Sequence, residues 1–259
     1  MYGDALVDLW CSRIQKGPDE YYSFKKLGAF SAGLAALSCF ILKPWESVVS
    51  CLVPQAQTVI IGQTAFCLRA LGRLSEASFL FFASMNRDVN SKNWKPAAVN
   101  AGNWCESELA LGAVSRAKDQ AELAVTFASR QSDRFEYALA LTVWADALHQ
   151  ARKQVRARLF FRSAEKINAS AQPNFSQLYG LAGFRYCDLI LSKVEHSAWQ
   201  VWLKTNCSIK TTNSELSVRS TRDVLCEGIQ KFNLRPVLLR AAIRIAAERS
   251  IRSLRYLPK

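Results

Sequence analysis

The sequence predicts an all-α fold built from repeated helical hairpins. Three apolar runs end in comparable residue pairs at a step of 40 residues, at Leu71-Gly72, Leu111-Gly112 and Ala151-Arg152. Half of the residues are hydrophobic, which is enough for a continuous core along an array of hairpins. Extended period-two alternation with Asn-Gly or Asp-Gly turns is missing, so no β-sheet is expected.

Fixed columns of small and aromatic side chains accompany this step. A small residue stands seven positions before the turn column, an alanine five positions after it, and mostly an aromatic residue four positions later. Because helices approach closely only where side chains are small, each unit is predicted to be a helix-turn-helix, and a period of this length is typical of a solenoid. The column residues are Ala65, Cys105 and Ala145; Gly72 and Gly112; Ala77, Ala117 and Ala157; and Phe81, Ala121 and Phe161.

Residues 1–54 are predicted to form an N-terminal helical hairpin that packs on the array. Apolar periodicity places a helix over 4–15, and Pro18 with Asp19 opens a second helix that runs to about Leu42. The irregular spacing of the aromatic residues in this segment favours core packing over a ligand-binding cage. These residues are Tyr21, Tyr22, Phe24, Phe30, Phe40 and Trp45.

Residues 55–195 are predicted to form the repeats. A helix begins at Pro54 and continues through Leu71. Three hairpins are expected from about 55 to 169, and a fourth unit begins near Phe175. Loops of a few residues make neighbouring helices antiparallel. The remaining helices are expected over 75–86, 95–111, 115–130, 134–151, 155–169 and 175–191.

These columns resemble the pattern of the tetratricopeptide-repeat family. The third unit departs from it with Arg152 in place of the turn glycine, the second has Ala121 in place of the aromatic residue, and the period exceeds the usual ~34 residues. The resemblance implies a right-handed solenoid in which the first helix of each unit lines a groove. The matching residues are Ala65, Gly72, Ala77 and Phe81 in one unit and Cys105, Gly112 and Ala117 in the next.

A narrower resemblance is to a group of bacterial tetratricopeptide proteins. The shared runs lie at 25–30, 68–74, 145–151 and 183–189, and the likeness extends over roughly residues 1–195. In proteins similar to these, the repeats stand alone or follow a nucleotide-hydrolysing signalling module of the STAND type. That module is not in this chain.

The resemblance also predicts which residues meet a partner. Phe66, Glu106 and Asp146 follow the small column and are expected to face the groove, and Arg69 and His149 stand three positions later in their units. Two acids at these positions argue against a clamp for a terminal carboxylate and favour a peptide with a basic or mixed face. In the alternative interpretation these charges only solvate the groove.

Catalytic motifs are missing from the sequence. It has no Gly-x-x-x-x-Gly-Lys-Ser/Thr phosphate loop, and its two histidines, His149 and His196, exclude a His-Glu-x-x-His zinc motif. Glu106 and Glu108 stand two apart, so they are not expected to act together and are interpreted as solvated or partner-facing. We therefore expect no enzymatic activity, no cofactor and no metal site.

A cytoplasmic location is expected. Asp4 and Asp8 replace the basic start of a secretory signal. The uncharged stretch 27–42 is shorter than the ~20 residues of a membrane span, and 48–68 contains Pro54 and three glutamines, so no span is expected. The eight cysteines form no Cys-x-x-Cys pair and are interpreted as small hydrophobic residues in a reducing compartment.

Residues 196–259 are predicted to be a basic, divergent C-terminal segment. They hold most of the net charge of +13, and arginines from Arg235 to Arg255 recur at helical spacing. This stripe is suited to nucleic acid, an acidic partner or an anionic membrane. The alternative is a diverged gene end without function, in which case an uncapped last hairpin would favour homo-oligomers.

Together these observations predict a non-enzymatic scaffold that binds a protein or peptide partner through the groove. Two alternatives stay open at this point. The chain is either the regulatory repeat region of a STAND-type signalling protein, with the nucleotide-binding module encoded upstream, or a nucleic-acid-binding protein that acts through residues 196–259. A helical repeat fold serves many functions and does not decide among them.

Overall fold

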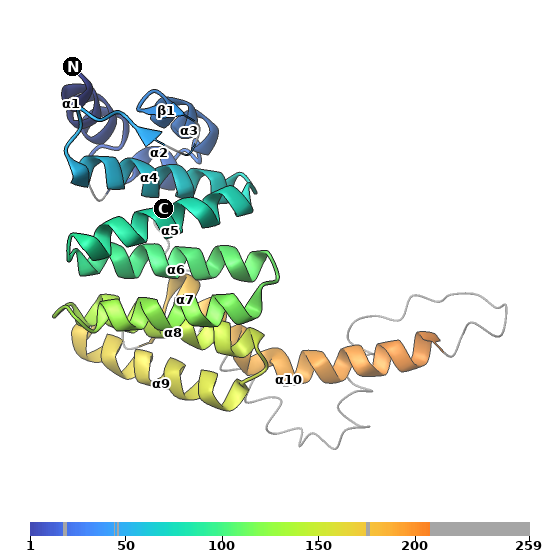
Figure 1. Ribbon diagram of the computed structural model, residues 1–259. Helices are drawn as coiled ribbons and strands as arrows, with labels where there is room; N and C mark the ends of the chain where they lie inside the picture. Colours follow the sequence, from blue (N-terminus) through green and yellow to red (C-terminus); the bar gives the residue numbers. More distant parts are fainter. Residues whose placement is uncertain (18–19, 44, 46, 175–176, 208–259) are drawn as a thin grey trace. The chain divides into compact units, whose positions relative to one another are not determined.

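The computed structural model describes residues 1–17, 20–43, 45, 47–174 and 177–207, and these are largely helical (Figure 1). The chain divides into two units, residues 1–152 and 153–259. For the residues that the structure describes, the prediction of an all-α chain is confirmed except for one small β-hairpin near the N-terminus. Among the described residues, no helix combines the length and the apolar character that a membrane span requires.

The first unit is built on five long helices that repeat at a step of 40 residues. α4, α6 and α8 each contain 17 residues and begin at positions 54, 94 and 134. α5 and α7 begin at 74 and 114 and alternate with them. The bounds are α4 Pro54–Ala70, α5 Leu74–Asn90, α6 Trp94–Ala110, α7 Val114–Ala128 and α8 Arg134–Gln150.

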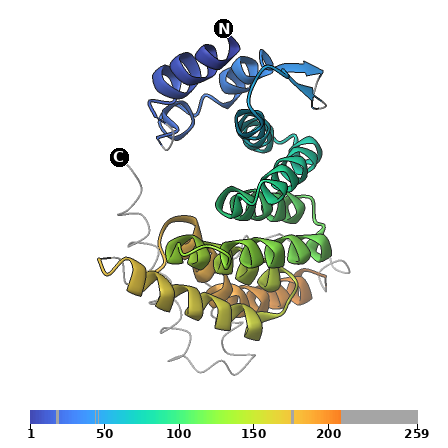
Figure 2. The same cartoon turned by 60° about the vertical axis from the view of Figure 1, so that its left-hand side comes forward.

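Consecutive helices of this set pack against each other in sequence order (Figures 1 and 2). In addition, α6 contacts both α4 and α8, so the first helices of successive hairpins touch one another. The columns of small residues allow the first and second helix of each hairpin to approach closely. The small residues of these columns in the first two hairpins, Ala65, Ala77, Cys105 and Ala117, are all fully buried. Their predicted packing role is therefore consistent with the structure.

The turns between these helices repeat as well. Gly72 and Gly112 adopt left-handed φ angles of 79° and 76°. At each of these turns a backbone N–H donates to a carbonyl five residues earlier, from Arg73 to Leu68 (2.9 Å) and from Ala113 to Glu108 (2.8 Å). This Schellman-type bond satisfies a carbonyl at the end of the helix. Lys92 has the same turn conformation, with φ 55°.

Arg152, where the sequence departs from the glycine pattern, also adopts a left-handed φ, of 59°. Its N–H donates to the carbonyl of His149 (2.8 Å), as Gly112 does to Leu109 (3.0 Å). The turn conformation is thus kept although the glycine is not. A non-glycine residue pays a steric cost in this region of φ/ψ space.

The junction before α8 is the exception. α7 ends at Ala128, and α8 begins after Asp133, whose side chain accepts hydrogen bonds from the N–H groups of Phe135 (3.1 Å) and Glu136 (3.2 Å). This is a side-chain N-cap, which satisfies donors that the first turn of a helix leaves without partners. The loop between α7 and α8 is therefore longer than the loops that join the other helices from α4 to α7.

The N-terminal segment differs from the predicted pair of long helices. The first helix is present, but η1 has π-type hydrogen bonds. The second, expected from Pro18 to about Leu42, is broken at Gly28, which adopts φ 59°, and the following helix ends at Ser38. The bounds are α1 Tyr2–Asp4, η1 Ala5–Ile14, α2 Tyr22–Lys25 and α3 Phe30–Ser38.

A two-stranded antiparallel sheet follows α3, so the expectation that no sheet would form was wrong here. β1 Ile41–Lys43 pairs with β2 Ser47–Val48, with Ile41 opposite Val48. Trp45, between the strands, adopts a left-handed φ of 64°. β-branched residues such as Ile41 and Val48 favour extended backbone, and a strand of two or three residues is too short to give a clear period-two pattern.

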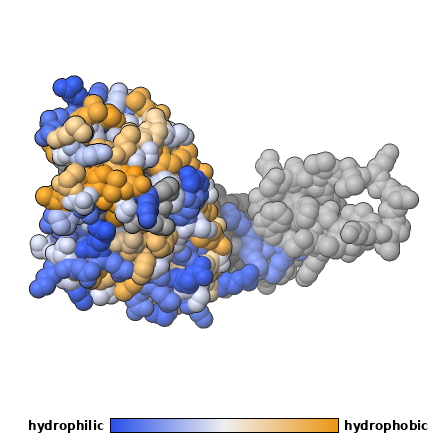
Figure 3. Space-filling model, turned by 45° about the horizontal axis from the view of Figure 1, so that its top comes forward, coloured by the Kyte–Doolittle hydropathy of each residue, from blue (hydrophilic) through white to orange (hydrophobic). Residues whose placement is uncertain are grey.

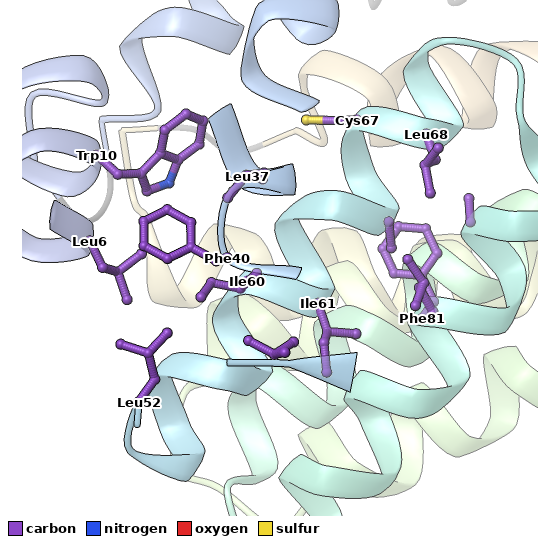
Figure 4. Close-up of a cluster of buried hydrophobic side chains, with 14 of the residues drawn as sticks. Leu6, Trp10, Leu37, Phe40, Leu52, Ile60, Ile61, Cys67, Leu68 and Phe81 are labelled. Carbon is purple, nitrogen blue, oxygen red and sulfur yellow. The ribbon is translucent and has the colours of Figure 1, made fainter. Parts of the chain in front are cut away.

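This N-terminal segment shares a hydrophobic core with α4 and α5 (Figure 4). Trp10 is 1% exposed and packs against Phe24 with tilted rings, at 5.9 Å between ring centroids. Its indole N–H also donates to Gln63 of α4 (2.6 Å). Of the aromatic residues that the sequence placed in a core, Phe24 and Phe40 are buried, and Tyr21, Phe30 and Trp45 pack against this core. Tyr22 instead lies under the ammonium of Lys16. Other members of this core are Leu6, Leu37, Leu52, Ile60, Ile61, Leu68 and Phe81.

The second unit begins with α9 Gln154–Ala171, followed by α10 Gly180–Cys207. Phe161 and Tyr186 stack at 4.8 Å between ring centroids, and Ala157 is fully buried. α10 was expected to end near residue 191 and continues to Cys207. The predicted third hairpin, α8 with α9, spans the two units, so its pairing stays a prediction. The predicted basic stripe from Arg235 lies outside the described residues.

Candidate functional site

The five predicted partner-binding residues all lie on the first helices of the hairpins. Phe66 and Arg69 are on α4, Glu106 is on α6, and Asp146 and His149 are on α8. These positions recur at the 40-residue step, and α6 contacts both α4 and α8. We call this surface the first-helix face: positions 59, 66 and 69 of α4 and their equivalents 99, 106 and 109 on α6 and 139, 146 and 149 on α8.

Arg69 and Glu106 form an ion pair that joins α4 to α6. The guanidinium Nη1 of Arg69 donates to a carboxylate oxygen of Glu106, and each side chain is 20% exposed. The same guanidinium lies over the rings of Phe66 (5.3 Å) and Phe81 (5.7 Å). The acid at position 106 is therefore neutralised internally. This weakens the sequence argument for a partner peptide with a basic or mixed face.

Phe66 meets the protein's own N-terminal segment. Its ring packs against Phe24 (5.9 Å) and Phe30 (6.0 Å), and its neighbour Gln63 accepts the hydrogen bond from Trp10. The α4 portion of the first-helix face is partly covered as a result. Phe66 is half-buried and offers less surface to a partner than the sequence suggested.

Asp146 and His149 lie three residues apart on α8. Asp146 is only 8% exposed, so its carboxylate is largely withdrawn from solvent. His149 is half-buried on the last turn of the helix, where a cation complements the helix dipole. The structure thus brings Phe66, Arg69 and Glu106 into one contact network and places the other two predicted residues on α8.

Two exposed valines lie on the same face, and they are not among the residues predicted from the sequence. Val59 of α4 is 47% exposed and Val99 of α6 is 44% exposed. They occupy equivalent positions, seven residues before Phe66 and Glu106 respectively, and a spacing of seven returns to the same side of a helix. The signal was available in the sequence as one more column at the 40-residue step.

A second set of ion pairs joins α6 to α8 near the beginning of both helices. The ammonium of Lys95 lies 3.0 Å from a carboxylate oxygen of Asp133 and 3.5 Å from one of Glu136. The hydrogen bond to Asp133 raises the pKa of Lys95, and the same bond holds the pKa of Asp133 below its usual value. Because the groups are substantially exposed, the pair contributes little to stability.

Glu108 does not behave as expected for a solvated acid. It is 4% exposed and accepts hydrogen bonds from the hydroxyl of Ser78, the indole of Trp104 (3.2 Å) and the guanidinium of Arg116 (2.7 Å). Burial raises the pKa of Glu108, but the bonds from Ser78 and Arg116 outweigh burial and hold this pKa below its usual value. Its place three residues after the buried Cys105 was the sequence signal for burial.

Glu106 and Glu108 point to different neighbours, as predicted from their spacing. Glu106 reaches α4, whereas Glu108 reaches α5 and the beginning of α7. Neither is placed to assist the other in proton transfer. Glu108 has a structural role, because it ties three helices together at a point that solvent hardly reaches.

A second buried carboxylate, Asp88, lies between α5 and α6. It is 4% exposed and accepts a hydrogen bond from the amide of Asn100 (2.9 Å), which also donates to Ser84 (3.0 Å). The hydroxyl of Ser84 donates to the carbonyl of Thr58 on α4 (3.2 Å). These partners are neutral, and burial raises the pKa of Asp88 to about 6.

The described residues contain no cluster of three or more His, Cys, Asp or Glu side chains that could hold a metal ion. Apolar and polar residues are interspersed on the face shown in Figure 3. A scan of protein-family models and a search of curated proteins gave no match. The likeness to tetratricopeptide repeats therefore stays a prediction.

Proposed function

We propose that this chain is a helical repeat scaffold of tetratricopeptide type, and that it holds a protein or peptide partner on its first-helix face without chemistry of its own. The observation that carries the proposal is the repetition of helix bounds and turns at 40 residues. Structural repeats of this kind stack into extended surfaces that are used for binding.

Two features of the first-helix face support this use. Contacts between first helices join residues 37 and 38 positions apart, Arg69 with Glu106 and Lys95 with Asp133, so the face is continuous from α4 to α8. Between these ion pairs, Val59 and Val99 leave apolar surface exposed at equivalent positions. Exposed apolar side chains rimmed by polar groups are typical of interaction sites.

The geometry of the first-helix face favours a more apolar partner than the basic or mixed peptide that the sequence suggested. The carboxylate of Glu106 is paired and that of Asp146 is mostly buried, so neither presents a free negative charge. We expect the partner to contribute apolar side chains that pack beside Val59 and Val99, with polar contacts at the margins. A purely basic peptide would gain little from this face.

The test compares two variants of the full chain. Val99→Glu places a charge on the first-helix face at a half-exposed position, where the fold tolerates it. Leu123→Glu makes the matched change on α7, where Leu123 is 36% exposed. Proteins retained from a cell lysate are identified by mass spectrometry for the parent and both variants. We expect a partner that is retained by the parent and by Leu123→Glu and is lost with Val99→Glu.

The opposite pattern would contradict the proposal. A partner that survives Val99→Glu but is lost with Leu123→Glu binds the second helices instead. Circular dichroism of both variants confirms that the loss reflects binding and not unfolding, because neither position contributes to the buried core.

A further inference from the structure

α9 carries a concentration of positive charge on its exposed side. Its charged residues are four cations and a single acid, Glu165. By contrast, α7 carries two cations and two acids, and α5 carries one cation and two acids. All four cations of α9 are exposed: Arg156, Arg158, Arg162 and Lys166.

Two aliphatic side chains lie among these cations. Val155 is 79% exposed and Leu159 is 57% exposed. Residues three and four apart are neighbours on a helix surface, so Val155, Leu159 and Arg162 follow one another along a single stripe. Arg158 stands beside Val155, Arg156 stands beside Leu159, and Lys166 continues the stripe.

The opposite side of α9 is buried and packs in part against α10 of the same unit. Ala157, Phe161 and Ala164 are fully buried, and Phe161 stacks on Tyr186 of α10. Within the described part of the chain, none of the four cations forms an ion pair or a hydrogen bond through its side chain. The helix is thus held by one side and presents a basic stripe with an aliphatic centre on the other.

We propose that this α9 stripe is a second docking surface, separate from the first-helix face, and that it binds an acidic amphipathic helix of a partner protein. Three of the four cations are arginines, whose planar guanidinium groups match carboxylates in a bidentate geometry. The aliphatic centre receives the apolar side chains of the partner helix at spacings of three and four residues. Both parts of the stripe are then used.

Other anionic partners use only part of it. Nucleic acids are held mainly through phosphates, and an aliphatic centre of two exposed residues has no counterpart along a phosphate backbone. A membrane surface requires a broader apolar face, usually with large residues such as Trp, Phe and Leu. On α9 the exposed large apolar residues are Val155 and Leu159 alone.

The probe is a fluorescent synthetic helix of roughly 18 residues, five turns long, with leucines along one stripe and glutamates on both flanks. Its binding to the full chain is followed by anisotropy. Arg162→Glu should weaken binding about tenfold, since it replaces an attractive charge with a repulsive one. The matched control is Arg134→Glu on α8, an exposed arginine outside the stripe, which should leave binding unchanged.

A second variant tests the aliphatic centre. Leu159→Ser keeps every charge and should weaken binding of the peptide severalfold while leaving binding of a single-stranded RNA of similar length unchanged. The proposal is overturned if the peptide does not bind at low salt. It is also overturned if the RNA, or vesicles of phosphatidylcholine with phosphatidylserine, bind more tightly than the peptide, or if Leu159→Ser changes nothing. None of these results depends on the first-helix face.

Discussion

The hairpins α4/α5 and α6/α7 have the same backbone plan but different interiors. Their first helices have the same length, and both hairpins turn at a left-handed glycine. Along the second helix, however, the buried positions of α5 are occupied by Phe81, Ser84 and Asp88, and the equivalent positions of α7 by alanine. These alanines are Ala121, Ala124 and Ala128.

The difference shows which positions set the repeat and which are free to vary. The turn glycines and the columns of Ala65 and Ala77 keep their character in both hairpins, because they fix how closely the helices approach. Further along, the first hairpin combines a large ring with a buried polar network. The second uses small side chains, and the half-buried Trp144 and Val143 of α8 pack against its cluster.

The largest effect on stability is expected for Phe81→Ala. This change gives the first hairpin the alanine that the second hairpin has at the equivalent position, Ala121. Phe81 is fully buried in the core shared with the N-terminal segment, so its removal should cost about 3–5 kcal/mol of unfolding free energy. Chemical denaturation measures this. Phe79→Ala, at a ring that is 58% exposed, is the control and should change stability little. Equal losses of unfolding free energy for the two variants would show that position 81 is wrongly assigned to the buried aromatic column.

A smaller loss is expected for Ala117→Leu in the alanine-lined hairpin. Ala117 is fully buried where α7 approaches α6, and the extra carbons have no space without separating the helices. Overpacking of this kind costs roughly 1–3 kcal/mol. Ala110→Leu makes the same change at an exposed position of α6 and serves as the control. A variant at position 117 that melts like the parent would contradict the close helix contact.

The buried polar network around Asp88 predicts that stability depends on pH. The pKa of Asp88 is raised from 3.8 to about 6, so the folded state binds a proton more tightly than the unfolded chain. The stability that the protonated Asp88 carboxyl contributes is fully present below its pKa in the unfolded chain, and it is lost as the pH rises through the folded pKa of about 6. Over this window the loss is on the order of 2 kcal/mol.

Asp88→Asn should remove this dependence, because the amide does not titrate and still accepts a hydrogen bond from Asn100. The measurement is the difference in unfolding free energy between parent and variant at pH 4 and pH 7. No charged group on the neighbouring helices competes. Arg69 and Glu106 pair with each other, Glu108 binds Arg116, and Lys95 binds Asp133 and Glu136. If the difference in unfolding free energy between parent and variant is the same at pH 4 and pH 7, Asp88 does not titrate in this range with a raised pKa.

The smallest effects are expected at the turns. Gly112→Ala should lower the unfolding free energy by about 1 kcal/mol. Nothing lies within 4 Å of an added Cβ, so the cost comes from the left-handed φ alone. Lys92→Gly should raise the unfolding free energy by roughly 0.5 kcal/mol. Glycine relieves the steric cost of the left-handed φ, and this gain exceeds the loss from the greater conformational entropy of the unfolded chain. Thermal unfolding at fixed pH measures both. Changes of the same sign at the two positions would contradict the shared turn geometry.

The sequence predicted the array well because its period is local and repeated. Small residues and turn pairs recur at one step, and each of the long helices α4 to α9 overlaps its predicted range. The N-terminal segment was predicted poorly because it has no repeat. There, Gly28 ended a helix that apolar periodicity alone would have continued, and the two short strands were too brief to produce an alternating pattern.

The candidate site was predicted in position but not in electrostatics. The 40-residue step placed Arg69 and Glu106 on adjacent first helices, yet it did not show that they pair with each other. Which acids are buried was also hidden, because a carboxylate such as Glu108 enters the interior only when donors from other helices converge on it. Such convergence depends on tertiary packing.

The most direct test of the account is photo-cross-linking from the first-helix face. A benzoyl-phenylalanine side chain introduced at position 99 is compared with one at position 123, both in the full chain, in a lysate that contains the partner. We predict a cross-linked partner at position 99 and none at position 123. Cross-linking from position 123 alone would place the partner on the second helices and contradict the proposed function.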